Sequence, residues 1–150
     1  MYQIKKVAIE VELFVGKGET LKGAIFVTEE ISSFVHIPRL EDFLNREQSF
    51  IPFRHEDGHY SLFNKDRIYY LRSSEDDHKF FEEDLLLEPI SVEVNFHESV
   101  TEKGVVYPNM PVDQRRASDY FNQEHQFVPL YQDGKKLIVN TTQIPYFTDK

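Results

Sequence analysis

The sequence predicts a mainly β protein of the α+β class, made of two tandem β-β-α-β-β-β units. The principal observation is an internal repeat: residues 39–53 and 116–130 share the pattern R-x-x-D-[FY]-[LF]-N-x-E-x-x-F-[IV]-P-[FL]. A repeat of this kind indicates one supersecondary unit that is used twice. Strand-like alternation precedes each copy, and 150 residues fit one domain or two very small ones. We assign residues 1–72 to a first unit, 73–89 to an acidic linker and 90–150 to a second unit.

The chain begins with a predicted β-hairpin. Residues 7–15 alternate between apolar and polar side chains, which is the period of a half-buried strand. Glycines within 16–19 favour a turn, and 21–27 forms the returning strand. Gly23 and its counterpart Gly104 are expected to mark a bend or bulge in the second strand of each unit.

A short helix is predicted next, over 39–45. Its apolar residues fall at helical spacing, and the preceding Pro38 is well suited to the start of a helix. Asn45 is expected to end this helix in a left-handed conformation. The segment before it, 28–38, fits either a continued strand or a loop with a short strand at 34–37.

Three strands complete the first unit. They are predicted over 49–53, 60–63 and 67–71. An Asp57-Gly58 turn joins the first two. Because Pro52 cannot donate a ladder hydrogen bond, its strand is expected to lie at a sheet edge or to end there. In the linker that follows, a helix beginning after Ser74 and a strand through 85–87 both fit the pattern.

The same pattern returns from residue 90. Alternate apolar residues of 90–96 match those of 9–15 at an offset of 81, and Arg116 matches Arg39 at an offset of 77. Four further matches have an offset of 76: Gly134 with Gly58, Asn140 with Asn64, Ile144 with Ile68, and Tyr146 with Tyr70. Because the offset changes only in loops, we expect two homologous units that differ in loop length.

The two units are expected to pack together as one pseudo-symmetric body. Each alone is small for a stable core, so burying faces against each other would stabilise both. A pseudo-twofold axis is the expected relation, and partly open barrels and a joint sheet are both compatible with the pattern. Three repeated apolar pairs are predicted to lie in the core: Phe50/Phe127, Phe43/Tyr120 and Leu44/Phe121.

The composition disfavours several classes of function. The net charge of −9, from 26 acidic and 17 basic residues, disfavours binding to nucleic acid and to anionic membranes. The absence of cysteine excludes disulfides, thiol catalysis and thiolate metal sites. No apolar run is long enough to span a bilayer, and the first residues lack the apolar segment of a signal peptide. A cytoplasmic protein without a membrane partner is therefore expected.

No catalytic, metal or cofactor site is predicted. His55, Asp57 and His59 alternate and could place metal ligands on one side of a strand, but they straddle a turn. The second unit has Gln132 and Asp133 at the corresponding positions, without a histidine pair. The chain has no phosphate-binding Gly-rich loop, no G-x-S-x-G motif and no combined set of nucleophile, base and orienting group. We therefore expect a protein without enzymatic activity and without a cofactor.

Polar residues are also repeated. The pairs are Arg39/Arg116, Asp42/Asp119, Asn45/Asn122 and Glu47/Glu124. In one interpretation, the Asp and Asn residues fix the helix ends and the Arg pairs with a nearby acid. In the other, the first three pairs form a ligand-binding patch that is displayed once in each unit.

Parts of each unit resemble the Sm-like barrel. Residues 11–23 are similar to its first hairpin, and 62–71 and 137–147 are similar to its closing hairpin. The resemblance implies a small open barrel in each unit, here with a helix-bearing segment in the middle. Asn-Lys at 64–65 and Asn-Thr at 140–141 stand where the Arg-Gly of RNA-binding members would be expected, so RNA binding does not carry over.

The complete repeat, with R-x-x-D-x-[LF]-N followed by F-[IV]-P, also resembles a family of small bacterial β-rich proteins. That resemblance implies no particular activity for any residue.

The repeat and the missing catalytic set favour a non-enzymatic interaction or assembly module. Such a module would bind a protein partner or associate with itself through strand edges. Tyr69, Tyr107 and Tyr131 are expected to be exposed near these edges. The alternative is a small-ligand sensor that binds an anion between the two units, where Arg39 and Arg116 would come together.

Overall fold

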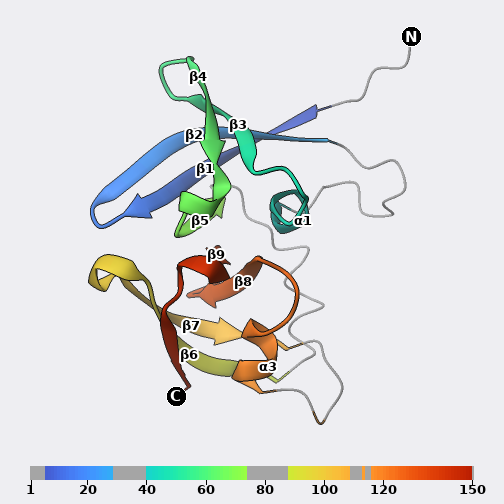
Figure 1. Ribbon diagram of the computed structural model, residues 1–150, viewed down its shortest axis with the longest axis vertical. Coiled ribbons are helices and arrows are strands. Elements are labelled where there is room, and N and C mark those ends of the chain that lie inside the picture. The colour runs from blue at the N-terminus through green and yellow to red at the C-terminus, as the bar shows by residue number, and fades with distance from the viewer. Residues whose placement is uncertain (1–5, 29–39, 74–87, 109–112, 114–115, 150) are drawn as a thin grey trace.

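The protein is mainly β, as the sequence predicts (Figure 1). The computed structural model describes residues 6–28, 40–73, 88–108, 113 and 116–149. The strands are β1 (Lys6–Gly16), β2 (Glu19–Thr28), β3 (Phe50–His55), β4 (Tyr60–Asn64), β5 (Tyr70–Ser73), β6 (Ile90–Asn95), β7 (Thr101–Val106), β8 (Phe127–Gln132), β9 (Lys135–Asn140) and β10 (Tyr146–Asp149). The helices are α1 (Leu40–Leu44) and α3 (Ala117–Phe121), with 3-10 turns η1 (Lys65–Arg67), η2 (His97–Ser99) and η4 (Thr141–Gln143).

The ten strands of the described residues form one open antiparallel sheet, in the order β10-β6-β7-β8-β9-β5-β1-β2-β3-β4. The N-terminal half contributes β1 to β5 and the C-terminal half contributes β6 to β10, and the halves meet where β5 pairs with β9. In the orientation of Figure 1, the N-terminal half with α1 lies above the C-terminal half with α3. Of the two arrangements compatible with the sequence, the joint sheet is the one observed.

The expected pseudo-twofold relation is wrong. The pair β5–β9 joins the fifth strand of one half to the fourth strand of the other. Two-fold symmetry would therefore also pair β10 with β4, but these strands lie at the opposite ends of the sheet. The halves are joined head to tail, and each end of the described sheet keeps one free strand edge.

The first hairpin forms where the alternation predicts it. β1 buries Ile9, Val11 and Leu13 and exposes Glu10 between them. The turn into β2 contains Gly18 at a φ of +74°, a conformation that glycine adopts without strain.

Gly23 serves a close approach between strands rather than a bulge. The register shift of the first hairpin lies near its turn and not at Gly23. A Cβ on Gly23 would lie 2.1 Å from the carbonyl oxygen of Arg54 in β3, and one on Gly104 would lie 2.6 Å from that of Tyr131 in β8. Glycine at both positions lets the second and third strands of each half come into contact.

Three local predictions are corrected by the structure. Pro52 is not at a sheet edge, because β3 lies between β2 and β4, but β2 pairs only with 53–55 and so needs no donor from Pro52. The strand expected over 67–71 begins only at Tyr70, because η1 includes Arg67 and the two residues after it belong to neither element. Asn45 is not left-handed, and its side chain is used elsewhere, as the junction described below explains. The alternatives for 29–38 and 74–87 lie outside the described residues.

The buried apolar side chains form two clusters. The first cluster comprises Ile9, Val11, Leu13, Ile25, Val27, Leu40, Leu44, Ile51, Phe53, Ile68, Leu71, Phe127 and Ile138. The second cluster comprises Tyr69, Tyr70, Val92, Val94, Phe96, Val106, Ala117, Tyr120, Val128, Leu130, Leu137 and Val139. Each cluster therefore contains residues of both halves.

Some residues differ in burial from the prediction. Phe50, expected in the core, is exposed, whereas its counterpart Phe127 is buried. Tyr69 and Tyr131, expected at the surface, are both buried. Tyr69 lies next to the strand pair that joins the halves, and Tyr131 lies in β8, an interior strand of the sheet. Burial here follows from the order of the strands, which the local pattern does not contain.

Candidate interaction surface

The junction between the halves is an antiparallel strand pair. Tyr70 of β5 lies opposite Val139 of β9, and Arg72 lies opposite Leu137. The pairing continues beyond β5, since the backbone N–H of Asn140 donates to the carbonyl oxygen of Tyr69 at 2.9 Å. This pair makes a single sheet out of two five-stranded halves.

Asn140 is completely buried at this junction. Its Nδ2 donates to the carbonyl oxygen of Ile68 at 2.9 Å, and more loosely to those of Asp66 at 3.3 Å and Lys65 at 3.4 Å. Its Oδ1 accepts from the backbone N–H of Thr142 at 3.1 Å. Because both ends of the amide are satisfied, Asn140 holds η1 of one half against the end of β9 in the other.

Asn45 makes a second contact across the junction. Its Nδ2 donates to the carbonyl oxygen of Phe127 at 2.9 Å, and its Oδ1 accepts from the backbone N–H of Phe127 at 2.8 Å. The side-chain amide thus satisfies both polar groups of one β8 residue, as a neighbouring strand would. Asn45 is positioned by α1, which buries Leu40 and Leu44, and Lys65 Nζ donates to the Leu44 carbonyl oxygen at 2.8 Å.

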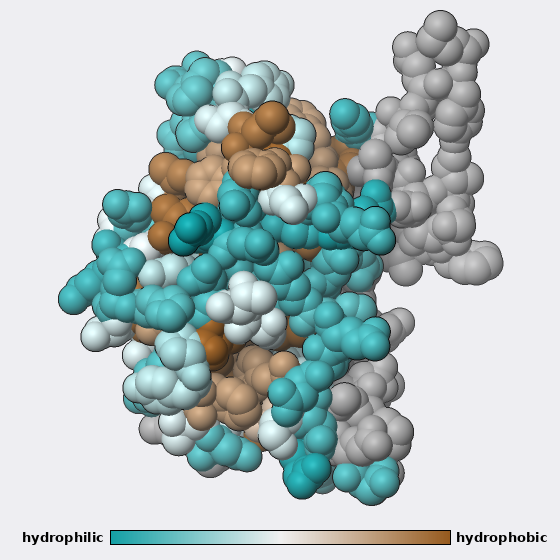
Figure 2. Space-filling model, in the orientation of Figure 1, coloured by the Kyte–Doolittle hydropathy of each residue, from teal (hydrophilic) through white to brown (hydrophobic). Residues whose placement is uncertain are grey.

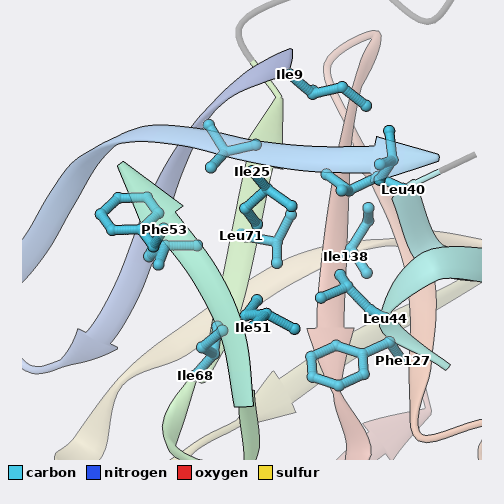
Figure 3. Close-up of a cluster of buried hydrophobic side chains, with 13 residues drawn as sticks. Ile9, Ile25, Leu40, Leu44, Ile51, Phe53, Ile68, Leu71, Phe127 and Ile138 are labelled. Carbon is cyan, nitrogen blue, oxygen red and sulfur yellow. The ribbon is translucent and has the colours of Figure 1, made fainter. Parts of the chain in front are cut away.

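The apolar cores also cross the junction (Figure 3). Phe127 and Ile138 of the C-terminal half point into the first cluster, where both lie near Leu44 of α1. In the opposite direction, Tyr69 and Tyr70 of the N-terminal half belong to the second cluster. Full burial of an apolar side chain of this size contributes about 1.5–3 kcal/mol. The junction is therefore stabilised by burial as well as by hydrogen bonds.

An ion pair joins α1 to β9. Lys136 Nζ lies 3.2 Å from each carboxylate oxygen of Glu41, and both side chains are only 8% exposed. Charges so far removed from water must stay paired, since a lone buried charge is strongly destabilising. The pair therefore fixes α1 against the C-terminal half.

Two tyrosines of the N-terminal half donate to glutamates of the C-terminal half. The Tyr69 hydroxyl donates to Glu98 Oε1 and the Tyr70 hydroxyl donates to Glu102 Oε1, each at 2.7 Å. Burial and the hydrogen bond to Glu98 raise the pKa of Tyr69 to about 12. Burial and the Glu102 carboxylate likewise raise the pKa of Tyr70. Both hydroxyls remain protonated donors over the ordinary pH range.

The free edges of the described sheet are β4 and β10. Of the exposed large hydrophobic residues, Tyr60 and Leu62 lie on β4, Tyr146 lies on β10, and Phe50 lies opposite Asn64 of β4. In the orientation of Figure 1, Figure 2 shows hydrophobic surface in the upper part of the molecule, where β4 lies, and again over the C-terminal half below. Apolar surface on an unpaired strand edge is a ready-made site for another strand.

These exposed residues have buried counterparts at the junction. Their exposed fractions compare as follows: Phe50 54% with Phe127 1%, Leu62 71% with Ile138 1%, and Tyr146 60% with Tyr70 4%. The two residues of each pair are matched by the predicted repeat. The side chains that the junction buries thus have matching side chains near the free edges that are exposed to solvent.

The residues predicted for a ligand patch lie around two separate helices. Asp42 and Asn45 lie in and after α1, and Arg116, Asp119 and Asn122 lie around α3 in the other half (Figure 1). Arg39 lies outside the described residues. The patch remains a prediction, since the contacts described for these residues are structural ones.

Arg116 and Asp119 form the pair that the structural interpretation predicts. Arg116 Nε donates to Asp119 Oδ2 at 2.9 Å, and the Arg116 backbone N–H donates to the same oxygen at 3.2 Å, which caps α3. The side-chain hydrogen bond lowers the pKa of Asp119 and raises that of Arg116.

Other candidate sites are weaker. A surface hollow of about 820 Å³ lies over β6, β7 and β8, and its lining includes Lys103 and Gln132 but none of the described patch residues. The rings of His55 and His59 stack at 4.0 Å, and His59 contacts Asp57, as alternation would allow. Within the described residues, no group of three or more His, Asp or Glu side chains is arranged to hold a metal ion.

Sequence reasoning missed Glu41 and Lys136, which lie 95 residues apart. They are not part of the repeated pattern, because Ser118 and Tyr60 stand at the corresponding positions. The two halves differ at many other positions as well, so this departure alone could not have singled out the pair.

Comparison of the chain with protein-family models, with curated proteins and with solved structures found no match. None of the described helices combines the length and apolar character that crossing a membrane requires.

Proposed function

We propose that this protein is a non-enzymatic assembly module that associates with further copies of itself through the free edges β4 and β10. The observation that carries the proposal is the contrast between the junction and the edges. Phe127, Ile138 and Tyr70 are buried where β5 meets β9, whereas their counterparts are exposed. An exposed apolar strand edge binds another strand readily, because backbone hydrogen bonds and apolar burial act together.

We further propose that the two halves are repeats of one small Sm-like unit. The strand order supports this, since each half follows the order fifth, first, second, third, fourth. The registers support it as well. Phe50 opposite Asn64 corresponds to Phe127 opposite Asn140. In the same way, Val11 opposite Gly23 corresponds to Val92 opposite Gly104.

The experiment that tests self-association is light scattering of the purified protein over a range of concentrations. We expect a solution mass that is a multiple of the 17.8 kDa chain mass. Leu62→Glu places a charge on the β4 edge and should shift the mass towards the monomer.

Val7→Glu is the matched control. Val7 is also an exposed apolar residue, but it lies in β1, an interior strand of the sheet. This variant adds the same charge and should leave the mass unchanged. A wild-type mass of 17.8 kDa at every concentration would overturn the proposal.

A further inference from the structure

We infer that successive copies join head to tail, with β10 of one copy pairing antiparallel to β4 of the next in the register of the internal β5–β9 pair. This inference rests on the proposed function and adds the partner edge, the register and the residues that hold it. Its basis is that the two free edges are unlike each other and complementary. β10 is the fifth strand of its half, and β4 is the fourth strand of its half. The internal pair likewise joins a fifth strand, β5, to a fourth strand, β9.

The internal register predicts the external one. Tyr70 opposite Val139 and Arg72 opposite Leu137 become, after the offset of 76, Tyr146 opposite Phe63 and Thr148 opposite Ser61 of the next copy. Side chains directly opposite in an antiparallel pair lie on the same face of the sheet and contact each other. Leu62 would then lie opposite Phe147, in an apolar contact.

Asn122 is the residue that should clamp the next copy. It corresponds to Asn45, whose amide binds both backbone groups of Phe127. Phe127 corresponds to Phe50, which is exposed at the start of β3. Asn122 is itself exposed, so its side chain is accessible to another copy. Across the external junction it would bind Phe50 of the next copy.

The second cluster is open at the place where such a residue would enter. In the first cluster, Leu44, Ile68 and Leu71 are fully buried around the incoming Phe127 and Ile138. Their counterparts in the C-terminal half are Phe121, Ile144 and Phe147, which are only partly buried against the second cluster. Phe50 and Leu62 of the next copy correspond to Phe127 and Ile138, so they would cover these three side chains.

The external junction would lack the ion pair of the internal one. Glu41 and Lys136 are replaced there by Ser118 of one copy and Tyr60 of the next. If β5 of one copy paired with β4 of another instead of with its own β9, Glu41 would be buried without Lys136. The ion pair therefore favours assemblies in which N-terminal and C-terminal halves alternate. Head-to-tail contacts produce a closed ring when the rotation closes and a filament when it does not.

Cysteine cross-linking tests the register directly, because the chain has no cysteine of its own. Ser61→Cys and Thr148→Cys are prepared as separate full-length variants, mixed and mildly oxidised. We expect a disulfide-linked pair of chains in the mixture and none from either variant alone. Tyr60→Cys mixed with Thr148→Cys is the control, since residue 60 points to the opposite face of the strand.

The outcomes separate this inference from the proposed function. Cross-linking of a single variant with itself, or an assembled protein whose mixed variants do not cross-link, would overturn the head-to-tail register while self-association stands. A monomeric wild-type protein would overturn both. As a second readout, Asn122→Ala should weaken assembly about tenfold through loss of backbone hydrogen bonds, with the monomer fold retained. Unchanged assembly of the Asn122→Ala variant would show that Asn122 does not bind the next copy.

Discussion

Glu41 of α1 and Lys136 of β9 form an ion pair in which each side chain is 8% exposed, although the two residues lie in different halves of the protein. Lys136→Met should therefore destabilise the fold by about 3–5 kcal/mol, because it leaves the Glu41 carboxylate buried without its partner. Denaturant unfolding of the single variant measures this loss.

The control is the double variant Glu41→Leu with Lys136→Met. Replacing both charges by apolar side chains removes the unpaired charge, and stability should return to within about 1 kcal/mol of the wild type or exceed it. A single variant as stable as the wild type would show that Glu41 finds another partner or remains hydrated.

Asn45 and Asn122 should differ in their effect on stability. Asn45→Ala removes the partner of both backbone groups of Phe127 and should cost about 1–3 kcal/mol. Asn122→Ala removes an exposed side chain and should cost less than about 0.5 kcal/mol in the monomer. Thermal unfolding of dilute protein compares the two, and equal losses would contradict this account of the junction.

Gly23 should not tolerate any side chain. A Cβ there would lie 2.1 Å from the Arg54 carbonyl oxygen, which belongs to the backbone of β3 and cannot move alone. We expect Gly23→Ala to cost about 3 kcal/mol or more, at the upper end of overpacking effects. Gly16→Ala is the comparison, because its added Cβ would meet only the flexible side chains of Glu98 at 3.2 Å and Glu19 at 3.8 Å. Circular dichroism during thermal unfolding distinguishes the two variants.

Stability should fall at alkaline pH through the junction tyrosines. The pKa of Tyr69 is raised to about 12 in the folded protein, whereas in the unfolded chain it is about 10. The folded state then binds more protons than the unfolded state, so the contribution is complete below pH 10 and is lost as pH rises towards 12. Tyr70 acts in the same direction.

The measurement is the free energy of unfolding as a function of pH for the wild type and for Tyr69→Phe. The variant has no hydroxyl to ionise, so its stability should depend less on pH between 10 and 12. Identical pH dependence in both proteins would show that Tyr69 does not hold a raised pKa.

Local features of the fold could be read from the sequence. The alternation that predicts a strand over 7–15 is produced by one face of β1, so it needs no knowledge of distant residues. The Asp57-Gly58 and Asp133-Gly134 turns followed in the same way, and both glycines have positive φ. The repeat also predicted that both halves would contain similar strands and one short helix.

The candidate site was less accessible to sequence reasoning. Asp119 and Arg116 pair three residues apart, and this contact was predicted because it is local. Asn45 does end α1, as predicted, but not in the expected left-handed conformation, and its contact with Phe127 was missed because that residue lies 82 positions away. The Glu41–Lys136 pair was not anticipated at all.

By itself, the sequence determined most of the strands and turns, because these depend on neighbouring residues, and it predicted a correspondence between the two halves. Only the tertiary structure decided that Phe127 is buried and Phe50 exposed, although both occupy the same place in the repeat. The physical reason is that burial depends on which strand lies alongside. β9 is covered by β5 within the chain, whereas β4 and β10 are left at the ends of the sheet.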